Sequence, residues 1–93
     1  MPKQSLNQLH DQLQTGSTAA ITTNMYLIID AIQAASPATQ VQAMSLLFLL
    51  VNDYYGLDPR QSLERGDAIR REAKRTSDPL MEAALRYIEG ELS

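Results

Sequence analysis

The chain has 93 residues, no cysteine and a net charge of −3. These totals fit one small domain over residues 1–93, and they exclude a disulfide framework, a thiol nucleophile and a thiolate metal site. The apolar content of 44% is too high for a disordered chain. The pI near 4.9 argues against a nucleic-acid binder, because that class usually has a basic excess.

Targeting signals are not visible in the sequence. The N-terminal stretch MPKQSLNQLH lacks the apolar centre of a signal peptide. No run reaches the ~20 apolar residues that a membrane-spanning helix needs. We therefore expect a cytoplasmic protein, located in the host cytoplasm if the chain is phage-encoded.

Charge is distributed unevenly along the chain. Residues 1–52 contain only Lys3, Asp11 and Asp30 as charged side chains, whereas residues 53–93 hold the other sixteen. The first half instead has Gln, Asn, Ser and Thr as its polar residues. Uncharged polar groups cost less to dehydrate than charges, so this half is the easier one to bury against a partner. A neutral surface without a partner is an equally good interpretation.

Two helices are predicted before residue 36. Ser5 and Gln8 have the spacing of a capping box, and the leucines that follow have the spacing of one helical face, as far as Gly16. Ser17 or Thr18 caps a second helix that we expect to reach about Ala35. The run MYLIID within it is also typical of a strand, but the longer 3.6-residue spacing and the lack of a partner strand favour a helix.

Three later helix starts share one feature, a Ser or Asp directly before a proline. Such a side chain caps the helix, and proline suits the first helical position because its φ is already helical and it lacks an unsatisfied amide. These pairs predict helices near 37–55, 59–75 and 79–91. Gly66 lies inside the second of the three, and Asp67 could cap a new start there, so a break or kink at this point is left open.

The stretch Val41–Val51 is the most apolar part of the chain, and from Ala43 onward only Ser45 interrupts it. Its apolar side chains point in all directions around a helix. A helix of this kind is usually enclosed by other protein or by lipid, and the run is about half the length of a membrane span. We therefore expect an all-α fold, a compact bundle of four to five short helices around a central apolar helix at about 37–55, which a second copy of the chain could help to cover.

The predicted helix 59–75 carries most of the basic residues. Five of them fall within roughly 140° on a helical wheel: Arg60, Arg70, Arg71, Lys74 and Arg75. Such a stripe can bind an acidic protein surface or nucleic-acid phosphates. The simpler interpretation is a solvated face with internal ion pairs to Glu64, Asp67 and Glu72.

A helix-turn-helix motif is tested by the residues around Gly56. In that motif a small residue lies four before the glycine, and apolar residues lie six and nine after it. Here the three positions hold Asn52, Ser62 and Arg65. We interpret all three as unsuited to packing two helices together, and we reject the motif.

No catalytic, cofactor-binding or metal-binding residues can be named. His10 is the only histidine and has neither a nucleophile nor further ligands near it in the sequence. The paired-glutamate cluster of carboxylate metal sites is absent, as are the common nucleotide-binding and hydrolase motifs. We therefore predict a protein that is not an enzyme and needs no cofactor.

The remaining candidates are contact residues. Tyr54 and Tyr55 end the apolar helix, and tyrosine is enriched at interfaces; one of the two is expected in the core and the other in a contact. The sequence favours a small helical protein–protein interaction module, homodimeric and also binding another protein as a regulator, adaptor or phage-type inhibitor. The alternative is a nucleic-acid-associated protein that uses helix 59–75.

Overall fold

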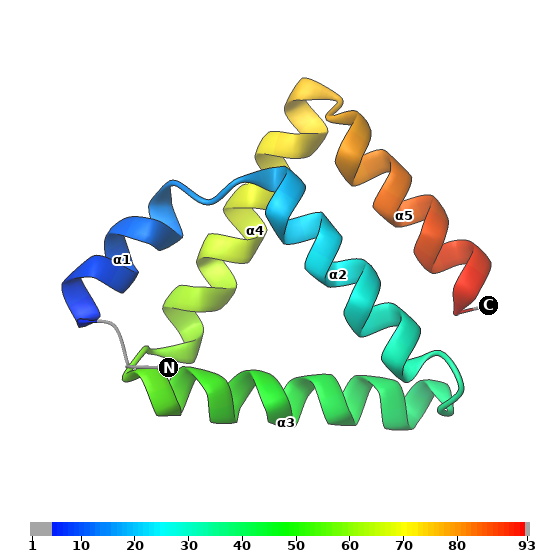
Figure 1. Cartoon of the computed structure of the whole chain (residues 1–93), viewed down its shortest axis with the longest axis horizontal. Helices are drawn as coiled ribbons and strands as arrows, with labels where there is room; N and C mark the ends of the chain where they lie inside the picture. Colours follow the sequence, from blue (N-terminus) through cyan, green and yellow to red (C-terminus); the bar gives the residue numbers. More distant parts are fainter. Residues whose placement is uncertain (1–4, 93) are drawn as a thin grey trace.

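The computed structural model describes residues 5–92, and the chain forms five helices in this range (Figure 1). They are α1 (Leu6–Gln14), α2 (Thr18–Ile32), α3 (Pro37–Tyr55), α4 (Pro59–Thr76) and α5 (Pro79–Glu91). None of residues 5–92 lies in a strand. The predicted all-α class is confirmed, and MYLIID belongs to a helix. No helix among these residues has the length and hydropathy to cross a membrane.

Every helix begins with a side-chain cap. The caps are Ser5, Ser17, Ser36, Asp58 and Asp78, each of which accepts a hydrogen bond from a backbone amide of the first turn. Proline occupies the first turn of α3, α4 and α5, as the Ser-Pro and Asp-Pro pairs predict. Such a cap contributes about 1 kcal/mol of helix stability, so local sequence fixes the helix boundaries.

The ends of α3 and α4 are set by left-handed residues. Gly56 has φ of 73° and ends α3, where the amide of Leu57 donates to the carbonyl of Asn52 at 2.8 Å. Ser77 has φ of 51° and ends α4. Gly66 does not interrupt α4, which runs without a break from Pro59 to Thr76.

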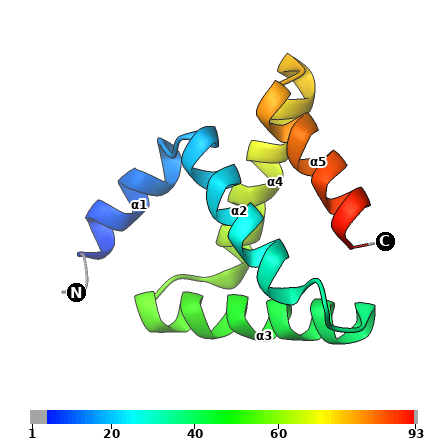
Figure 2. The same ribbon diagram turned by 45° about the vertical axis from the view of Figure 1, so that its right-hand side comes forward.

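The helices form the predicted small all-α bundle, and its outline is triangular (Figure 1). In Figures 1 and 2, α3 is the base, α2 and α4 rise from its two ends, and α5 lies beyond α2. The packed pairs are α2 with α5, α3 with α4, and α4 with α5. The small core lies among α2, α4 and α5 and contains Thr22, Ile29, Ala73 and Ala84.

The expectation that α3 is enclosed is wrong for the single chain. Nine of its large apolar side chains are exposed, among them Leu46 at 58%, Leu47 at 57% and Leu50 at 56%. The physical reason is the topology. The two neighbouring helices leave α3 from its ends (Figure 1), so most of its length is uncovered. Even Val41, which lies on the same side of the helix as Asn52, is 61% exposed.

The overall dimensions lead to the same conclusion. A folded single-chain protein of 10.3 kDa exposes about 5,400 Å², whereas this chain exposes 7114 Å². Its radius of gyration is 14.2 Å, compared with about 12 Å for a compact domain of this length. The chain alone therefore buries less surface than a self-sufficient domain of its size.

The junction between α3 and α4 is polar. Asn52 is only 5% exposed, its amide nitrogen donates to the carbonyl of Phe48 at 2.7 Å, and its side-chain oxygen accepts from the hydroxyl of Ser62. The interpretation that these two residues are unsuited to packing is therefore wrong. The Ser62 hydroxyl and the Asn52 side-chain oxygen satisfy each other. These two polar residues can therefore pack at the junction between α3 and α4.

Replacing Asn52 tests this junction. We expect Asn52→Ala to lower the free energy of unfolding by roughly 1–3 kcal/mol, because the Ser62 hydroxyl loses its buried partner. Urea denaturation at fixed protein concentration measures the change. Ser45→Ala is the control on the same helix, since the hydroxyl of Ser45 is exposed and bonds only to its own turn. Equal stability of the two variants would contradict the role given to Asn52.

A second polar contact joins α2 to α5. The rings of Tyr26 and Tyr87 meet edge to face with centroids 4.8 Å apart, and the Tyr87 hydroxyl donates to Asp30. This hydrogen bond, with desolvation and the nearby negative charge, raises the pKa of Tyr87 to about 12. The folded chain therefore holds the Tyr87 proton more tightly than the unfolded chain does.

The raised pKa predicts a loss of stability in alkali. The contribution of the Tyr87 hydrogen bond is complete below pH 10, the ordinary pKa of tyrosine, and is lost as the pH rises through about 12. Thermal melts of the native chain and of Tyr87→Phe, followed by far-UV circular dichroism, measure this. The melting temperature of the native chain should fall more steeply over this interval. Parallel curves would contradict the prediction.

Candidate interaction surfaces

The largest candidate surface is the outer face of α3, the side turned away from the other helices. Five exposed residues lie within about 100° on this helix: Ala43, Leu46, Leu47, Leu50 and Tyr54. The opposite side bears the half-buried Phe48 and the buried Asn52. An apolar arc of this width is typical of a helix that packs against another helix.

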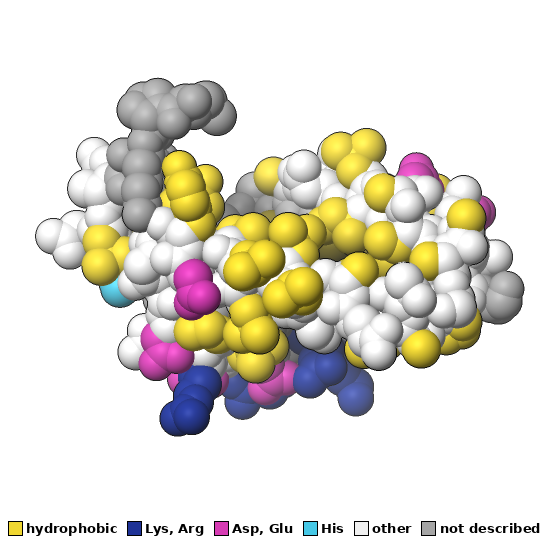
Figure 3. Space-filling model, turned by 90° about the horizontal axis from the view of Figure 1, so that it is seen from below, with side chains coloured by type: hydrophobic (Ala, Val, Ile, Leu, Met, Phe, Trp, Pro, Cys, Tyr) yellow, Lys and Arg dark blue, Asp and Glu magenta, His cyan; other side chains and the backbone are white. Residues whose placement is uncertain are grey.

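Figure 3 shows this surface directly, because it views the molecule from below α3. Hydrophobic side chains form patches over this face, densest left of the centre of the view, with polar and backbone atoms between them, and Lys and Arg lie along the lower border. A monomer rarely exposes an apolar patch larger than a few hundred Å² unless it binds something. The exposed hydrophobic side chains therefore make this face a candidate interaction surface.

Charge is nearly absent from α3. Asp53 is the only ionisable acidic or basic side chain between Pro37 and Tyr55, apart from the two tyrosines. Fully burying this helix against a partner therefore dehydrates few charged groups, and such dehydration is what most often opposes association. Most of α3 belongs to the charge-poor first half of the chain, so this half supplies much of the exposed apolar surface.

A groove of about 670 Å³ lies beside α3, between it and the start of α4. Met44, Phe48, Leu49 and Leu63 supply its apolar lining, and Asp58 and Arg60 supply its charged groups. It is continuous with the exposed side of α3 through Leu49, which is 47% exposed. The groove extends the apolar surface of α3 toward α4.

Three of the six basic residues of α4 form ion pairs with acidic residues of the same helix. Asp67 pairs with Arg70 at 2.5 Å and with Arg71 at 3.2 Å, and Glu72 pairs with Arg75 at 2.5 Å. The internal ion pairs expected for a solvated face are present at these positions. All these side chains are exposed, so each pair adds little stability.

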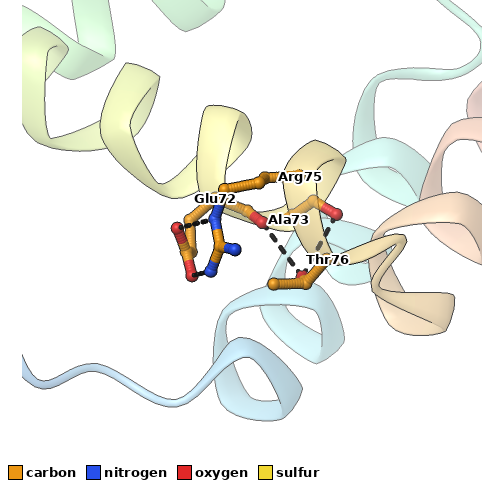
Figure 4. A network of polar contacts seen from close by, with 4 residues as sticks. All are labelled: Glu72, Ala73, Arg75 and Thr76. Carbon is orange, nitrogen blue, oxygen red and sulfur yellow. Dashed lines mark hydrogen bonds and ion pairs between the residues drawn. The ribbon is translucent and has the colours of Figure 1, made fainter.

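Figure 4 shows the pair at the end of α4. The Arg75 guanidinium donates to both carboxylate oxygens of Glu72, at 2.5 and 3.0 Å, and the Thr76 hydroxyl donates to the backbone carbonyls of Glu72 and Ala73. The bidentate hydrogen bond lowers the pKa of Glu72 and raises the pKa of Arg75. The Arg75 guanidinium is therefore already paired with the carboxylate of Glu72.

The other predicted contact residues divide between the two surfaces. Tyr54 and Tyr55 are 61% and 37% exposed and stack edge to face with centroids 4.9 Å apart; neither is in the core of the single chain, so the expectation of one buried tyrosine is wrong here. Tyr54 belongs to the outer face of α3. Arg60 and Lys74 are exposed on α4, at opposite ends of that helix, and form no ion pair within residues 5–92.

The remaining polar cluster lies between α1 and α4. His10, Asp11, Gln14 and Arg65 line a cavity of about 190 Å³, and an Arg65 guanidinium nitrogen donates to the Gln14 side chain at 3.3 Å. Within residues 5–92, no group of three or more His, Asp or Glu side chains could hold a metal ion. The cluster joins two helices and assembles no recognisable catalytic set.

No protein-family model, curated protein or solved structure matches this chain. Its function must therefore be inferred from the chemistry of its own surfaces.

Sequence reasoning missed the leucines of the outer face as contact residues, because it treated the whole apolar run as core. A signal was present. Ala43, Leu47, Leu50 and Tyr54 are spaced by four, three and four residues, the repeat of a helix-pairing seam. The uninterrupted apolar run around them hid this seam.

Proposed function

We propose that the protein is a non-enzymatic protein–protein interaction module that works as a homodimer through the outer face of α3. The observation that carries the proposal is the exposure of nine large apolar side chains on one helix that has a single acidic residue. A second protein surface that covers such a helix removes its apolar side chains from water and stabilises it.

The excess of exposed surface favours a second copy of the chain as the partner. The chain exposes about 1,700 Å² more than a folded monomer of its mass would, by the usual scaling of surface with mass. A standard interface removes about 800 Å² from each partner, so one dimer contact can account for a large part of the excess. An identical chain is also the one partner whose presence at matching concentration is guaranteed.

A dimer of this kind leaves other surfaces free to act on a further protein. The groove beside Leu63 and the exposed residues of α4 lie off the outer face of α3, and they could serve a regulator, an adaptor or a phage-type inhibitor. A chain without cysteine carries no mark of an oxidising compartment, which supports action in the cytoplasm, or the host cytoplasm for a phage protein.

The solution mass tests the proposal. Light scattering coupled to size exclusion at micromolar concentration should give the mass of two chains of 10.3 kDa each, with reversible dissociation on dilution. A mass of one chain at every concentration would remove the homodimer from the proposal.

The second candidate is nucleic-acid binding through α4. Six of the eight basic residues lie on this helix, and Arg60 and Lys74 remain available beyond the ion pairs. A mobility-shift assay at low salt tests it: binding should weaken with salt and be lost when Arg70, Arg71 and Lys74 are changed together to Gln. No shift at low salt would eliminate this candidate.

A further inference from the structure

We propose that the two copies pair their α3 helices antiparallel, with Ala43 of each chain facing Tyr54 of the other and Leu47 facing Leu50. This inference rests on the proposed homodimer and specifies its geometry. It follows from the spacing of the outer face, the sizes of its side chains and the direction of the helix dipole.

The seam residues are symmetric about the midpoint between Phe48 and Leu49. Positions 43 and 54 lie equally far from that midpoint, as do 47 and 50 and, on the flanks, 46 and 51. A two-fold axis through this point, perpendicular to the helix, carries each residue of one chain onto the same residue of the other chain, and it thereby places position 43 beside position 54 and position 47 beside position 50. An interface between identical chains with such an axis is self-complementary and closed, so assembly stops at two copies.

Side-chain size favours the antiparallel direction. Ala43 at one end of the seam is small, and Tyr54 at the other end is large and 61% exposed. Antiparallel pairing puts a large residue against a small one at both ends, so the helices can stay at one spacing of about 8–10 Å. Parallel pairing would put two tyrosines together at one end and two alanines at the other, and this would force the helices apart at the tyrosine end.

Electrostatics acts in the same direction with a smaller effect. The opposed helix dipoles favour the antiparallel pair.

The open side of α3 leaves room for this arrangement. Both views of the ribbon place α2, α4 and α5 on one side of α3 (Figures 1 and 2). Of the residues that the structure describes, 5–92, a second copy that approaches from the other side therefore meets only those of α3. The two triangles would lie back to back, with their basic α4 helices away from the seam centre.

Disulfide trapping tests the geometry, and the absence of cysteine from the chain removes any background. Ala43→Cys and Tyr54→Cys are made separately, and each is oxidised alone and after the two have been unfolded and refolded together. In the antiparallel pair the two copies of position 43, and likewise the two copies of position 54, lie roughly 16 Å apart along the axis. This separation is too large for a disulfide between identical variants.

The expected result is a cross-linked dimer only in the mixture, where random exchange places about half of the dimers in the mixed form. Ser45→Cys, on the opposite side of α3, is the control and should not cross-link with Tyr54→Cys. Light scattering of the same samples before oxidation separates two kinds of failure. A dimer in which Ala43→Cys cross-links with itself, or in which nothing cross-links, overturns the antiparallel seam and leaves the homodimer standing. A monomer overturns both.

Discussion

A chain that carries Leu47→Glu together with Leu50→Glu is expected to be monomeric at concentrations at which the native chain is dimeric. Both leucines are more than half exposed in the single chain, so glutamate disturbs the isolated fold little. In the dimer the same substitutions put four carboxylates into an apolar seam. The lost apolar burial and the dehydrated charges together should weaken association by on the order of a thousandfold or more. Sedimentation equilibrium measures the change.

The chain provides a matched control for this variant. Leu27 on α2 is 63% exposed, and Leu27→Glu adds the same charge at an apolar surface position away from α3. It should leave the dissociation constant unchanged within a few-fold. Dissociation by Leu27→Glu with retention of the dimer in the double variant would show that α2, and not the outer face of α3, forms the interface.

The melting temperature of the native chain should rise with its concentration. When folding and association are coupled, each tenfold increase in concentration stabilises the dimer by about 1.4 kcal/mol. For two chains of 93 residues, the average unfolding entropy converts this into roughly 3–4 °C per tenfold increase. Far-UV circular dichroism over a hundredfold range of concentration measures the rise.

The double glutamate variant is the control for this effect too. It should melt at a lower temperature, and its midpoint should not depend on concentration, because its unfolding involves one chain. A concentration-independent midpoint in the native chain would mean that the small core of Ile29, Ala73 and Ala84 is sufficient on its own.

The helices could be predicted from the sequence because their boundaries depend on local chemistry. The pairs Ser36-Pro37, Asp58-Pro59 and Asp78-Pro79 mark helix starts that hold in the structure. A cap needs only its own first turn, so no knowledge of the rest of the fold is required. The same holds for Gly56, whose positive φ ends α3.

The position of α3 could not be predicted in the same way. The run Val41–Val51 is apolar on all sides, and this pattern indicates that the helix must be covered but not by which chain. Whether the cover comes from the same chain depends on the directions in which α2 and α4 leave its ends, and no local sequence feature encodes these directions. The interpretation of Asn52 and Ser62 failed for a related reason, since two polar residues pack well only when the fold brings their side chains together.

Side-chain footprinting with hydroxyl radicals measures directly whether the outer face of α3 is covered in solution. As the concentration of the native chain rises through the range of association, Leu47, Leu50 and Tyr54 should lose reactivity several-fold. Leu27 and Leu63, which are equally exposed in the single chain, should keep theirs. Unchanged reactivity of the three α3 side chains at concentrations where the mass is that of a dimer would show that the outer face of α3 is not the dimer interface.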